Sequence, residues 1–269
     1  MFNSCLCINF ASDFKCTLWF NTFRETQRSF IGILCRYTLC NLGLLEIIYR
    51  WMERGRRRKL MYFETTRSGA LSKLNNFVEK NILNYTSKRN FDFGVKNRDN
   101  VSGLSPYISH RLITEYETAK KVLSKYPVEK VEKYIQEIFW RVYWKGWLEL
   151  RPKVWSDFLE DLNNIEEDEN YKNAIDGKTQ IDCFNDWVKE LKESNYLHNH
   201  TRMWFASIWI FTLNLPWQKG AEFFMRYLFD GDAASNTLSW RWVAGLQTRG
   251  KQYVAQSWNI KKFTNNKYQ

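Results

Sequence analysis

The sequence predicts an all-α protein, and three observations support this fold class. The 269 residues include only 4 prolines and 12 glycines, which is few for a turn-rich β fold of this length. Apolar side chains recur at three- and four-residue spacing, the pattern of amphipathic helices. Alternating runs of β-branched residues, which indicate strands, are absent from the sequence. The length suits one large domain or two small ones.

The first 60 residues differ in character from the rest of the chain. The apolar segment 29–51 contains three charged side chains and is followed by a basic run. A membrane helix with a basic flank is one interpretation, although charges within a span cost free energy. We prefer a start codon placed too early, because Met52 and Met61 both precede the first regular helical pattern. We therefore treat residues 1–60 as an atypical extension and residues 61–269 as the helical domain.

The cysteines form no zinc-binding pattern. Five of the six lie within residues 1–40, without a CxxC pair, and the three histidines are all distant from them. We therefore expect no metal ion in this protein. The shortage of cysteine in the main body suits a reducing compartment, so we expect a cytoplasmic location.

Helices are expected in order from Thr65 onward. The first opens after Ser68, where "ALSKLNNFV" places apolar residues at three- and four-residue spacing. A polar loop follows, and Ser105–Pro106 then starts a second helix, since proline fits the first turn. A long aromatic helix is expected over Val128–Leu150.

The second half of the chain is expected to contain a loop and three further helices. The acidic, polar run Asn163–Lys178 is interpreted as the loop, because apolar residues are sparse in it. The apolar spacing predicts the helices over three later stretches, which are Asp182–Leu191, Asn199–Thr212 and Gly220–Leu228.

The composition favours a polyanionic partner and a flat ligand. The net charge is +11, from 40 basic and 29 acidic residues, and such a surplus favours nucleic acid over a membrane. A merely basic soluble protein would show the same surplus, so that alternative stays open. The 13 tryptophans are equally ambiguous, because indole rings serve both as core and as stacking surfaces for flavins, nucleobases or sugars.

Two helix faces carry residues that suit a binding site. Glu137, Trp140 and Arg141 fall at i, i+3 and i+4, so an acid, a flat ring and a cation share one face. They line a pocket or form a surface ion pair beside a half-buried ring, since buried charges need partners. Asn199 and Arg202 share another face, where an amide can recognise an amide-like edge and a guanidinium can pair with an acid.

Taken in chain order, these motifs become specific. The sequence resembles the FAD-binding domain of the DNA photolyase/cryptochrome family over roughly residues 65–264. The residues that carry the resemblance are Tyr85, "SGLSPY" (Ser102–Tyr107), "QEIFWR" (Gln136–Arg141), "LHNHTRM" (Leu197–Met203), "LPWQKGAEFFMRYLFDGD" (Leu215–Asp232) and "ASNTLSWRW" (Ala234–Trp242). The family fold is a helical bundle that binds FAD in a bent form, so the resemblance implies the same fold and cofactor here.

The resemblance also implies which residues hold the FAD. The phosphates are expected at Arg141 and at a loop whose backbone N–H groups and hydroxyls suit an anion, with Tyr85, Ser102, Leu104 and Ser105. The flavin ring is expected beside an Arg202–Asp230 ion pair, in a set completed by Asn199, Asp232 and Asn236. In the family, Asn236 corresponds to the residue that faces the reactive flavin nitrogen, and asparagine is usual there in photolyases.

The tryptophans near the C-terminus take separate roles by the same resemblance. Trp240 resembles the first ring of the family's electron-transfer chain, and Trp217 resembles the second. The third, surface ring is not matched, because the corresponding position falls near Leu162 and Trp155 is only a nearby substitute. The family's usual route of photoreduction is therefore incomplete here. Trp242 resembles a substrate-pocket residue.

The substrate implied is a cyclobutane pyrimidine dimer flipped out of ultraviolet-damaged DNA. The matching pocket residues provide two indoles as a clamp and a carboxylate for a thymine edge, and they are Glu137, Trp140, Asn199, Met203 and Trp242. Photolyases of the six-four lesion carry adjacent histidines where this chain has "HNHTRM", which favours the cyclobutane dimer. The sequence differs from the family pattern at two positions near these motifs. His200 replaces the family's usual arginine, and Tyr196 replaces a common tryptophan.

The function implied is light-driven repair of this dimer by an electron from excited, reduced FAD, as in a deoxyribodipyrimidine photolyase. The expected catalytic residues are Glu137, Asn236, Trp240 and Trp217. Nothing in the chain resembles the family's α/β antenna domain, so we expect a short form that collects light through FAD alone and acts as a monomer away from membranes. Two alternatives stay open: a flavoprotein that senses blue light or redox state without repair, and a domain that has lost FAD binding.

Overall fold

The computed structural model describes residues 63–248 and 250–268, which all lie in the second of two units into which the chain divides, 1–58 and 59–269. The described residues form helices and loops without a strand, so the all-α prediction is confirmed. No helix in this part of the chain is long and apolar enough to cross a membrane. The expected extension, 1–60, and the interpretation of its start codon lie outside the described residues.

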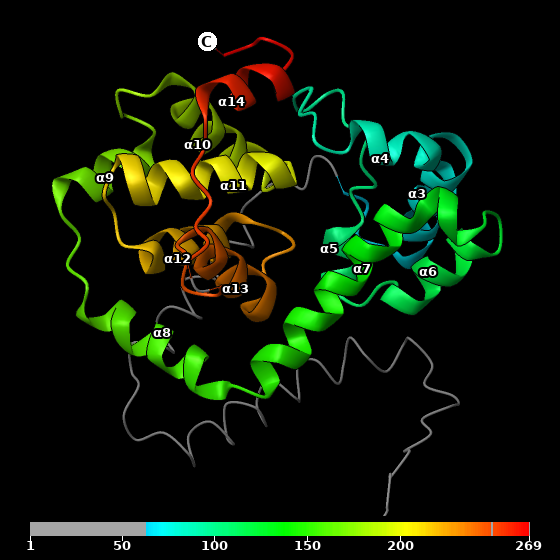
Figure 1. Ribbon diagram of the computed structural model, residues 1–269, viewed down its shortest axis with the longest axis horizontal. Coiled ribbons are helices and arrows are strands. Elements are labelled where there is room, and N and C mark those ends of the chain that lie inside the picture. Colours follow the sequence, from blue (N-terminus) through cyan, green and yellow to red (C-terminus); the bar gives the residue numbers. More distant parts are fainter. Residues whose placement is uncertain (1–62, 249, 269) are drawn as a thin grey trace, which may run out of the picture. The chain divides into compact units, whose positions relative to one another are not determined.

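The first group of packed elements runs from α3 to α7 (Figure 1). Its members are α3 (Arg67–Lys80), η1 (Ile82–Asn84), α4 (Tyr85–Lys88), α5 (Ser105–Ser109), α6 (Glu115–Leu123) and α7 (Val128–Glu149). A mainly aliphatic core joins them, in which Leu74, Ile113 and Val122 are buried. Thr66 and Thr114 begin α3 and α6 by accepting backbone N–H groups, so polar caps set both starts.

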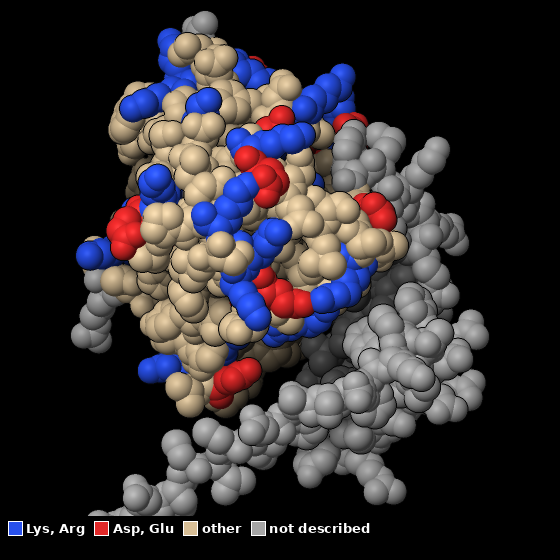
Figure 2. Space-filling view, turned by 90° about the vertical axis from the view of Figure 1, so that its right-hand side faces the viewer, with Lys and Arg blue, Asp and Glu red and all other residues tan. Residues whose placement is uncertain are grey.

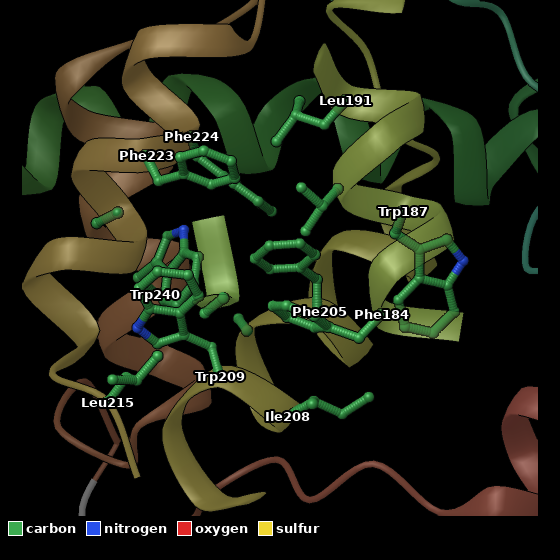
Figure 3. Close-up of a cluster of buried hydrophobic side chains, with 14 of the residues drawn as sticks. Phe184, Trp187, Leu191, Phe205, Ile208, Trp209, Leu215, Phe223, Phe224 and Trp240 are labelled. Carbon is green, nitrogen blue, oxygen red and sulfur yellow. The ribbon is translucent and has the colours of Figure 1, made fainter. Parts of the chain in front are cut away.

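The second group of elements surrounds an aromatic core (Figure 3). Its members are α8 (Pro152–Asn164), α9 (Glu169–Asp176), α10 (Asp182–Ser194), α11 (Asn199–Ser207), η2 (Ile208–Thr212), α12 (Trp217–Tyr227), α13 (Ala233–Val243) and α14 (Ser257–Phe263). Trp204 and Trp209 are completely buried, and Phe184 of α10 stacks on Phe205 of α11 with ring centroids 4.4 Å apart. Packing between these helices therefore rests on large aromatic contacts.

Helix α7 connects the two groups. Its N-terminal half packs against α4 and α6 and buries four side chains, Val131, Tyr134, Ile135 and Ile138. Its C-terminal half packs against α8 and α13 and leaves Phe139, Trp140 and Tyr143 more than half exposed. The same helix therefore belongs to a core at one end and presents aromatic rings to solvent at the other.

The stretches expected as helices correspond to α3, α5, α7, α10, α11 with η2, and α12. Helix α3 begins at Arg67, earlier than expected, because Thr66 caps it. The stretch Asn199–Thr212 is helical throughout, but its last part, η2, is a π-helix in which the Leu213 N–H donates to the Ile208 carbonyl at 2.9 Å.

The prediction of a loop over Asn163–Lys178 is wrong, because helix α9 lies within it. Asp168 caps the helix by accepting the Tyr171 N–H at 2.8 Å, and Gly177 ends it in the left-handed conformation with φ 67°. The apolar face of α9 consists of Tyr171 and Ala174, which are buried. Two such residues among acidic and polar neighbours are too few to show as a helical pattern in the sequence.

Candidate functional site

Polar side chains gather around the loop between α12 and α13. Arg202 of α11 donates from Nη2 to Asp230 Oδ2 at 2.9 Å and from Nε to the Leu197 carbonyl at 2.9 Å. Burial alone would raise the pKa of the Asp230 carboxyl, but the Arg202 guanidinium, helped by the Ser105 side chain, holds this pKa below its ordinary value. The structure thus contains the expected ion pair between Arg202 and Asp230, while its role toward a flavin stays a prediction.

Asp232 begins α13 and also reaches α7. Its Oδ1 accepts the Ser235 N–H at 2.8 Å, which caps the helix. Its Oδ2 accepts a hydrogen bond from Arg141 Nη2 at 2.8 Å, and Lys145 Nζ lies 3.8 Å from the same oxygen. One carboxylate therefore sets the start of α13 and holds two cations of α7 beside the loop.

Ser109, at the end of α5, links Arg141 to the same loop. The Ser109 hydroxyl accepts a hydrogen bond from Arg141 Nη2 and donates to the Asp230 backbone carbonyl at 3.0 Å. The loop is therefore fixed by α5 and α7 as well as by α11. Sequence reasoning missed Ser109, although it follows Ser105 by one helical turn and so shares its face.

Tyr196 lies between two guanidinium groups. Arg202 Cζ is 5.0 Å from the Tyr196 ring centroid, and Arg98 Cζ is 5.2 Å from it. Arg98 in turn forms an ion pair with Glu190 and lies 3.5 Å from Asp92 Oδ1. The stack connects Arg202 to a largely buried network of charges and restricts the positions that its guanidinium can take.

His198 is buried beside this network. Its Nδ1 accepts the His200 N–H at 3.2 Å and caps α11. Burial lowers the pKa of His198 to about 4, despite the nearby Asp92 carboxylate. That carboxylate is itself held by the Thr201 hydroxyl, which donates to Asp92 Oδ2 at 2.6 Å. His198 is therefore neutral in the folded protein at neutral pH.

Two of the residues expected at the FAD phosphates, Tyr85 and Ser102, lie beside Tyr134 of α7. Tyr85 contacts Tyr134 with ring centroids 5.1 Å apart, and the Ser102 side chain approaches the Tyr134 phenol, whose pKa burial raises to about 12. Leu104 is buried immediately before α5. Tyr134 precedes Arg141 by seven residues and so lies on the same face of α7. Sequence reasoning missed Tyr134, although that spacing could have indicated it.

Asn236, Trp240 and Trp217 lie on the packed pair α12 and α13. Asn236 is buried, and its Nδ2 donates to a backbone carbonyl of α12 at 2.8 Å. Trp240 is buried against Gly220, where an added Cβ would come within 2.3 Å of the indole, so only glycine allows this approach. The Trp217 ring stacks on Phe158 with centroids 5.4 Å apart. Asn236 and Trp240 are thus fixed by neighbouring helices.

Two of the residues expected to hold the substrate, Glu137 and Trp140, lie on α7. We call the stretch of α7 from Glu137 to Tyr143 its outer part. Trp140 is 51% exposed, and its ring centroid is 5.4 Å from that of Tyr143. Glu137 accepts a hydrogen bond from Arg89 at Oε1. The position of Glu137 is therefore fixed by an ion pair, whereas about half of the Trp140 side chain remains exposed to solvent.

The remaining expected substrate residues belong to α11 and α13. Trp242 stacks on Tyr253 with ring centroids 5.7 Å apart, Asn199 is exposed and Met203 is half-buried. Among the ring contacts of the described residues, none joins Trp140 to Trp242. The two indoles expected to clamp a dimer therefore do not touch each other in this structure.

His200, the departure noted in the sequence, is packed into the protein. Its Nδ1 lies 2.9 Å from the Asn90 carbonyl oxygen, and its ring centroid is 4.2 Å from that of Trp204. Burial lowers the pKa of His200 below its ordinary value. The side chain thus bonds to the protein itself and supplies no cation at neutral pH.

The inner part of the site keeps unused hydrogen-bonding capacity. Asp230 Oδ1 is buried and has no hydrogen-bond partner among the described residues, whereas Arg141 Nε lies 3.6 Å from Glu115 Oε1 and so already faces a carboxylate. A carboxylate oxygen accepts a hydrogen bond from a ring N–H, so Asp230 Oδ1 fits a ligand that carries such a group. In the described part of the chain, no group of three or more His, Cys, Asp or Glu side chains could hold a metal ion.

Comparison with known proteins relates the chain to one family. Residues 134–267 match the family described as the FAD binding domain of DNA photolyase. A deoxyribodipyrimidine photo-lyase from Buchnera aphidicola subsp. Baizongia pistaciae is 30% identical over 179 residues, which are 62% of this chain and 37% of that protein. Another from Agrobacterium fabrum is 30% identical over 185 residues, which are 66% of this chain and 38% of that protein.

The chain belongs to the DNA photolyase/cryptochrome family. A bacterial class III photolyase structure from Agrobacterium tumefaciens matches with a TM-score of 0.63 and 25% identity, over 74% of this chain and 43% of that one. A Synechocystis cryptochrome matches with a TM-score of 0.68 and 21% identity, over 77% of this chain and 45% of that one, and shows the shared fold alone. The chain spans less than half the length of these members of the family.

Proposed function

We propose that this chain binds FAD and repairs cyclobutane pyrimidine dimers in ultraviolet-damaged DNA by light-driven electron transfer. The observation that carries the proposal is Asp230, whose Oδ2 is fixed by Arg202 while its Oδ1 is buried without a hydrogen-bond partner among the described residues. Such an oxygen is an acceptor for the N–H edge of a flavin ring. The match to the FAD binding domain of DNA photolyase supports the same cofactor.

The residues of this chain hold and orient the cofactor. Arg202, Asp230 and Asn199 hold the flavin ring, and the phosphates are held by Arg141, Tyr85 and the loop of Ser102, Leu104 and Ser105. When bound and reduced, FAD supplies the electron that light transfers to the dimer. Asn236 keeps one orientation because it donates to the backbone of α12. The close packing of Trp240 against Gly220 excludes water from this side of the bundle.

The outer part of α7 binds the flipped dimer. The exposed ring of Trp140 offers a stacking surface for a base, as aromatic rings do in other proteins that bind unpaired bases. Glu137 uses Oε1 for Arg89, which leaves Oε2 to accept the N–H of a pyrimidine edge. The family resemblance assigns Trp242, Asn199 and Met203 to the same pocket.

The charge of the chain supports a polyanionic partner. The net charge of the full chain is +11, and residues 61–269 by themselves carry +5, from 30 basic and 25 acidic residues. Figure 2 shows Lys and Arg side chains spread over one face of the molecule, with Asp and Glu side chains among them. A dispersed basic surface attracts phosphates of any sequence, which suits an enzyme that recognises a lesion rather than a base sequence.

The packing of His200 favours a second candidate, a flavoprotein that senses blue light or redox state without repair. The family usually has arginine at this position, where a cation suits DNA phosphates. His200 instead bonds to the Asn90 carbonyl and stacks on Trp204. This chain therefore lacks one cation for DNA, which weakens lesion binding without affecting FAD.

A repair assay separates the two candidates. The full chain, loaded with FAD and chemically reduced, is mixed with ultraviolet-irradiated oligothymidine and illuminated with near-ultraviolet and blue light. The recovery of thymine absorbance is followed in the light and in the dark. We expect recovery only in the light, and free FAD at the same concentration serves as the control.

The other outcomes are equally informative. A protein that binds and reduces FAD but restores no thymine in the light would contradict repair and favour the sensory flavoprotein. A protein that retains no FAD after gel filtration would contradict the whole proposal. Recovery in the dark would indicate a reaction that does not need light.

A further inference from the structure

A cavity of about 220 Å³ lies beside the loop that joins α4 to α5. Its lining consists of four asparagines, one lysine, one aspartate and one phenylalanine. None of these residues belongs to the sets expected to hold FAD or the dimer. The cavity is therefore a polar site with one aromatic ring that neither of the proposed roles uses.

The loop that forms one wall of the cavity is held by the second group of helices. Its Asp92 N–H donates to the Phe263 carbonyl of α14 at 2.8 Å, and Figure 1 shows this loop beside α14. Arg98, in the same loop, pairs with Glu190 of α10 and lies 3.5 Å from Asp92 Oδ1. The wall is thus positioned by folding, so a ligand does not have to order it.

One of the lining asparagines, Asn100, is buried, with only 7% of the residue exposed. Its Nδ2 donates to the carbonyls of Lys88 and Phe91 at 2.8 and 2.7 Å, which uses both N–H groups and fixes the orientation of the amide. Its Oδ1 is buried and accepts no hydrogen bond from the described residues. Because such an oxygen costs free energy when it stays unpaired, it fits a ligand that brings an N–H or O–H donor.

The other polar groups of the lining add acceptors, donors and a cation. Asp99 carries further acceptor oxygens, and the side-chain amides of Asn84 and Asn97 can donate as well as accept. Lys88 adds an exposed ammonium group. Burial lowers the pKa of Lys73, and the nearby Asp99 carboxylate opposes this shift. Lys73 thus offsets part of the carboxylate's charge, so a phosphate beside Lys88 meets less repulsion.

Phe93 supplies the aromatic surface of the cavity. Its ring stacks on Phe91 with centroids 5.5 Å apart and an angle of 5° between the planes. Since 38% of Phe93 is exposed, the ring is held by a neighbour and keeps area that a ligand can cover. Unpaired bases stack on aromatic rings of this kind.

The lining is complementary to a nucleotide. The acceptor oxygens match the amino group of a base, the Phe93 ring matches its face, and the Lys88 ammonium matches a phosphate. Sites for drug-sized ligands occupy about 300–1,000 Å³, so this cavity has room for one base and its sugar rather than for a dinucleotide. We propose that the cavity binds one unpaired nucleotide whose base carries an exocyclic amino group, independently of FAD. Thymine lacks that group, so this second site should reject the base that a thymine dimer contains.

The nucleotide is either free or part of a DNA strand, because both present the same groups. Arg89, the residue after Lys88, pairs with Glu137, so the cavity adjoins in sequence a partner of the residue proposed to bind the dimer. Undamaged oligothymidine with one internal adenine, compared with pure oligothymidine, distinguishes the two sources. Tighter binding of the adenine strand that is lost in Phe93→Ala would assign the site to DNA. Equal binding of the two strands, together with binding of free dAMP, would assign it to a free nucleotide.

Titration calorimetry on the full chain measures the proposed binding. The protein is loaded with FAD and freed of excess FAD by gel filtration, so that dAMP cannot occupy the flavin site. We expect dAMP to bind with a Kd of about 1 mM or tighter, and dTMP to bind at least about tenfold more weakly. Phe93→Ala should weaken dAMP binding about tenfold, the effect of losing a base–aromatic stack.

Two exposed lysines, Lys88 and Lys96, provide matched variants. Lys88→Gln should weaken dAMP binding about tenfold, and it should leave the binding of deoxyadenosine, which has no phosphate, nearly unchanged. Lys96 belongs to the neighbouring loop but does not line the cavity, so Lys96→Gln should bind dAMP normally.

Three results would overturn the inference. One is the absence of dAMP binding at millimolar concentrations. The others are equal binding of dAMP and dTMP, and equal losses in the two lysine variants, because both indicate a general attraction for phosphates. A chain that retains no FAD contradicts the proposed function instead. Phe93→Ala and Lys88→Gln then still separate this cavity from an empty flavin site, so the two failures are distinguishable.

Discussion

The site has an inner side, formed by buried ion pairs near the loop between α12 and α13, and an outer side, formed by the exposed residues of α7 around Trp140. The two sides differ in how much of their surface is buried. On the inner side, Arg202 pairs with Asp230 and Arg141 pairs with Asp232, and the Asp230 side chain is only 4% exposed. On the outer side, Trp140 is 51% exposed. The inner geometry is therefore set when the chain folds, whereas the outer surface is left for a ligand to cover.

Because of this difference, substitutions on the inner side should change the free energy of unfolding, and substitutions on the outer side should change the affinity for the substrate. Charges on the inner side lose their water during folding, so removal of a partner there lowers the free energy of unfolding. Rings on the outer side lose their water during binding, so their truncation lowers affinity and leaves stability nearly unchanged. Substitutions on the two sides should therefore separate when unfolding and binding are measured independently.

The largest effect is expected from Asp230→Asn on the inner side. The variant keeps the shape of the side chain but leaves the Arg202 guanidinium without its counter-ion. We expect the free energy of unfolding of the FAD-free protein to fall by about 3 kcal/mol, the usual cost of breaking a buried pair. Urea unfolding measures this change directly, and FAD affinity should fall with it.

A double-mutant cycle provides the control for Asp230→Asn. Arg202→Gln removes the other partner, and the double variant should lose less than the sum of the two single losses, because each single change breaks the same pair. Strict additivity, or a change within ~0.5 kcal/mol for Asp230→Asn, would show that the inner side is not held by this ion pair.

A second effect, dependent on pH, is expected from His198 beneath the inner side. Its pKa is about 4 in the folded protein and about 6.5 in the unfolded chain, so the unfolded chain binds more protons between these values. The free energy of unfolding should therefore fall by up to about 3 kcal/mol as the pH falls from 6.5 to 4. Urea midpoints measured across this range test the prediction.

The variant His198→Asn isolates the titration. Asparagine keeps an oxygen that can accept the His200 N–H and cap α11, but it does not bind a proton in this range. The slope of stability against pH between 4 and 6.5 should decrease by about one proton in the variant. An unchanged slope would assign the pH dependence to other groups.

A helix could be predicted from the sequence where it buries one apolar face, and was missed where it does not. Helix α10 buries one face, and its apolar spacing indicated a helix. Helix α13 buries polar and apolar residues on several sides, including Asn236, Thr237 and Leu238, so no amphipathic period marks it. Helix α9 has only Tyr171 and Ala174 to bury, and its acidic composition led to the wrong prediction of a loop.

Some contacts of the site could also be predicted from the sequence, and others could not. The Arg202–Asp230 pair could be predicted because both residues belong to motifs that resemble a known family. The stack of Arg98 and Arg202 on Tyr196 could not, because Arg98 lies far from the other two residues in the sequence and meets them only through folding.

The smallest effect on stability, and the one that defines the outer side, is expected from Trp140→Ala. Since the ring is half exposed, the free energy of unfolding should change by less than ~0.5 kcal/mol. The affinity for ultraviolet-damaged oligothymidine in the dark should fall by about 1–3 kcal/mol, the cost of losing one base–aromatic stack. Trp258→Ala on α14, where the ring is 62% exposed, is the matched control and should bind normally. Equal losses in both variants would mean that exposed rings bind DNA without regard to position, and the outer part of α7 would then hold no specific pocket.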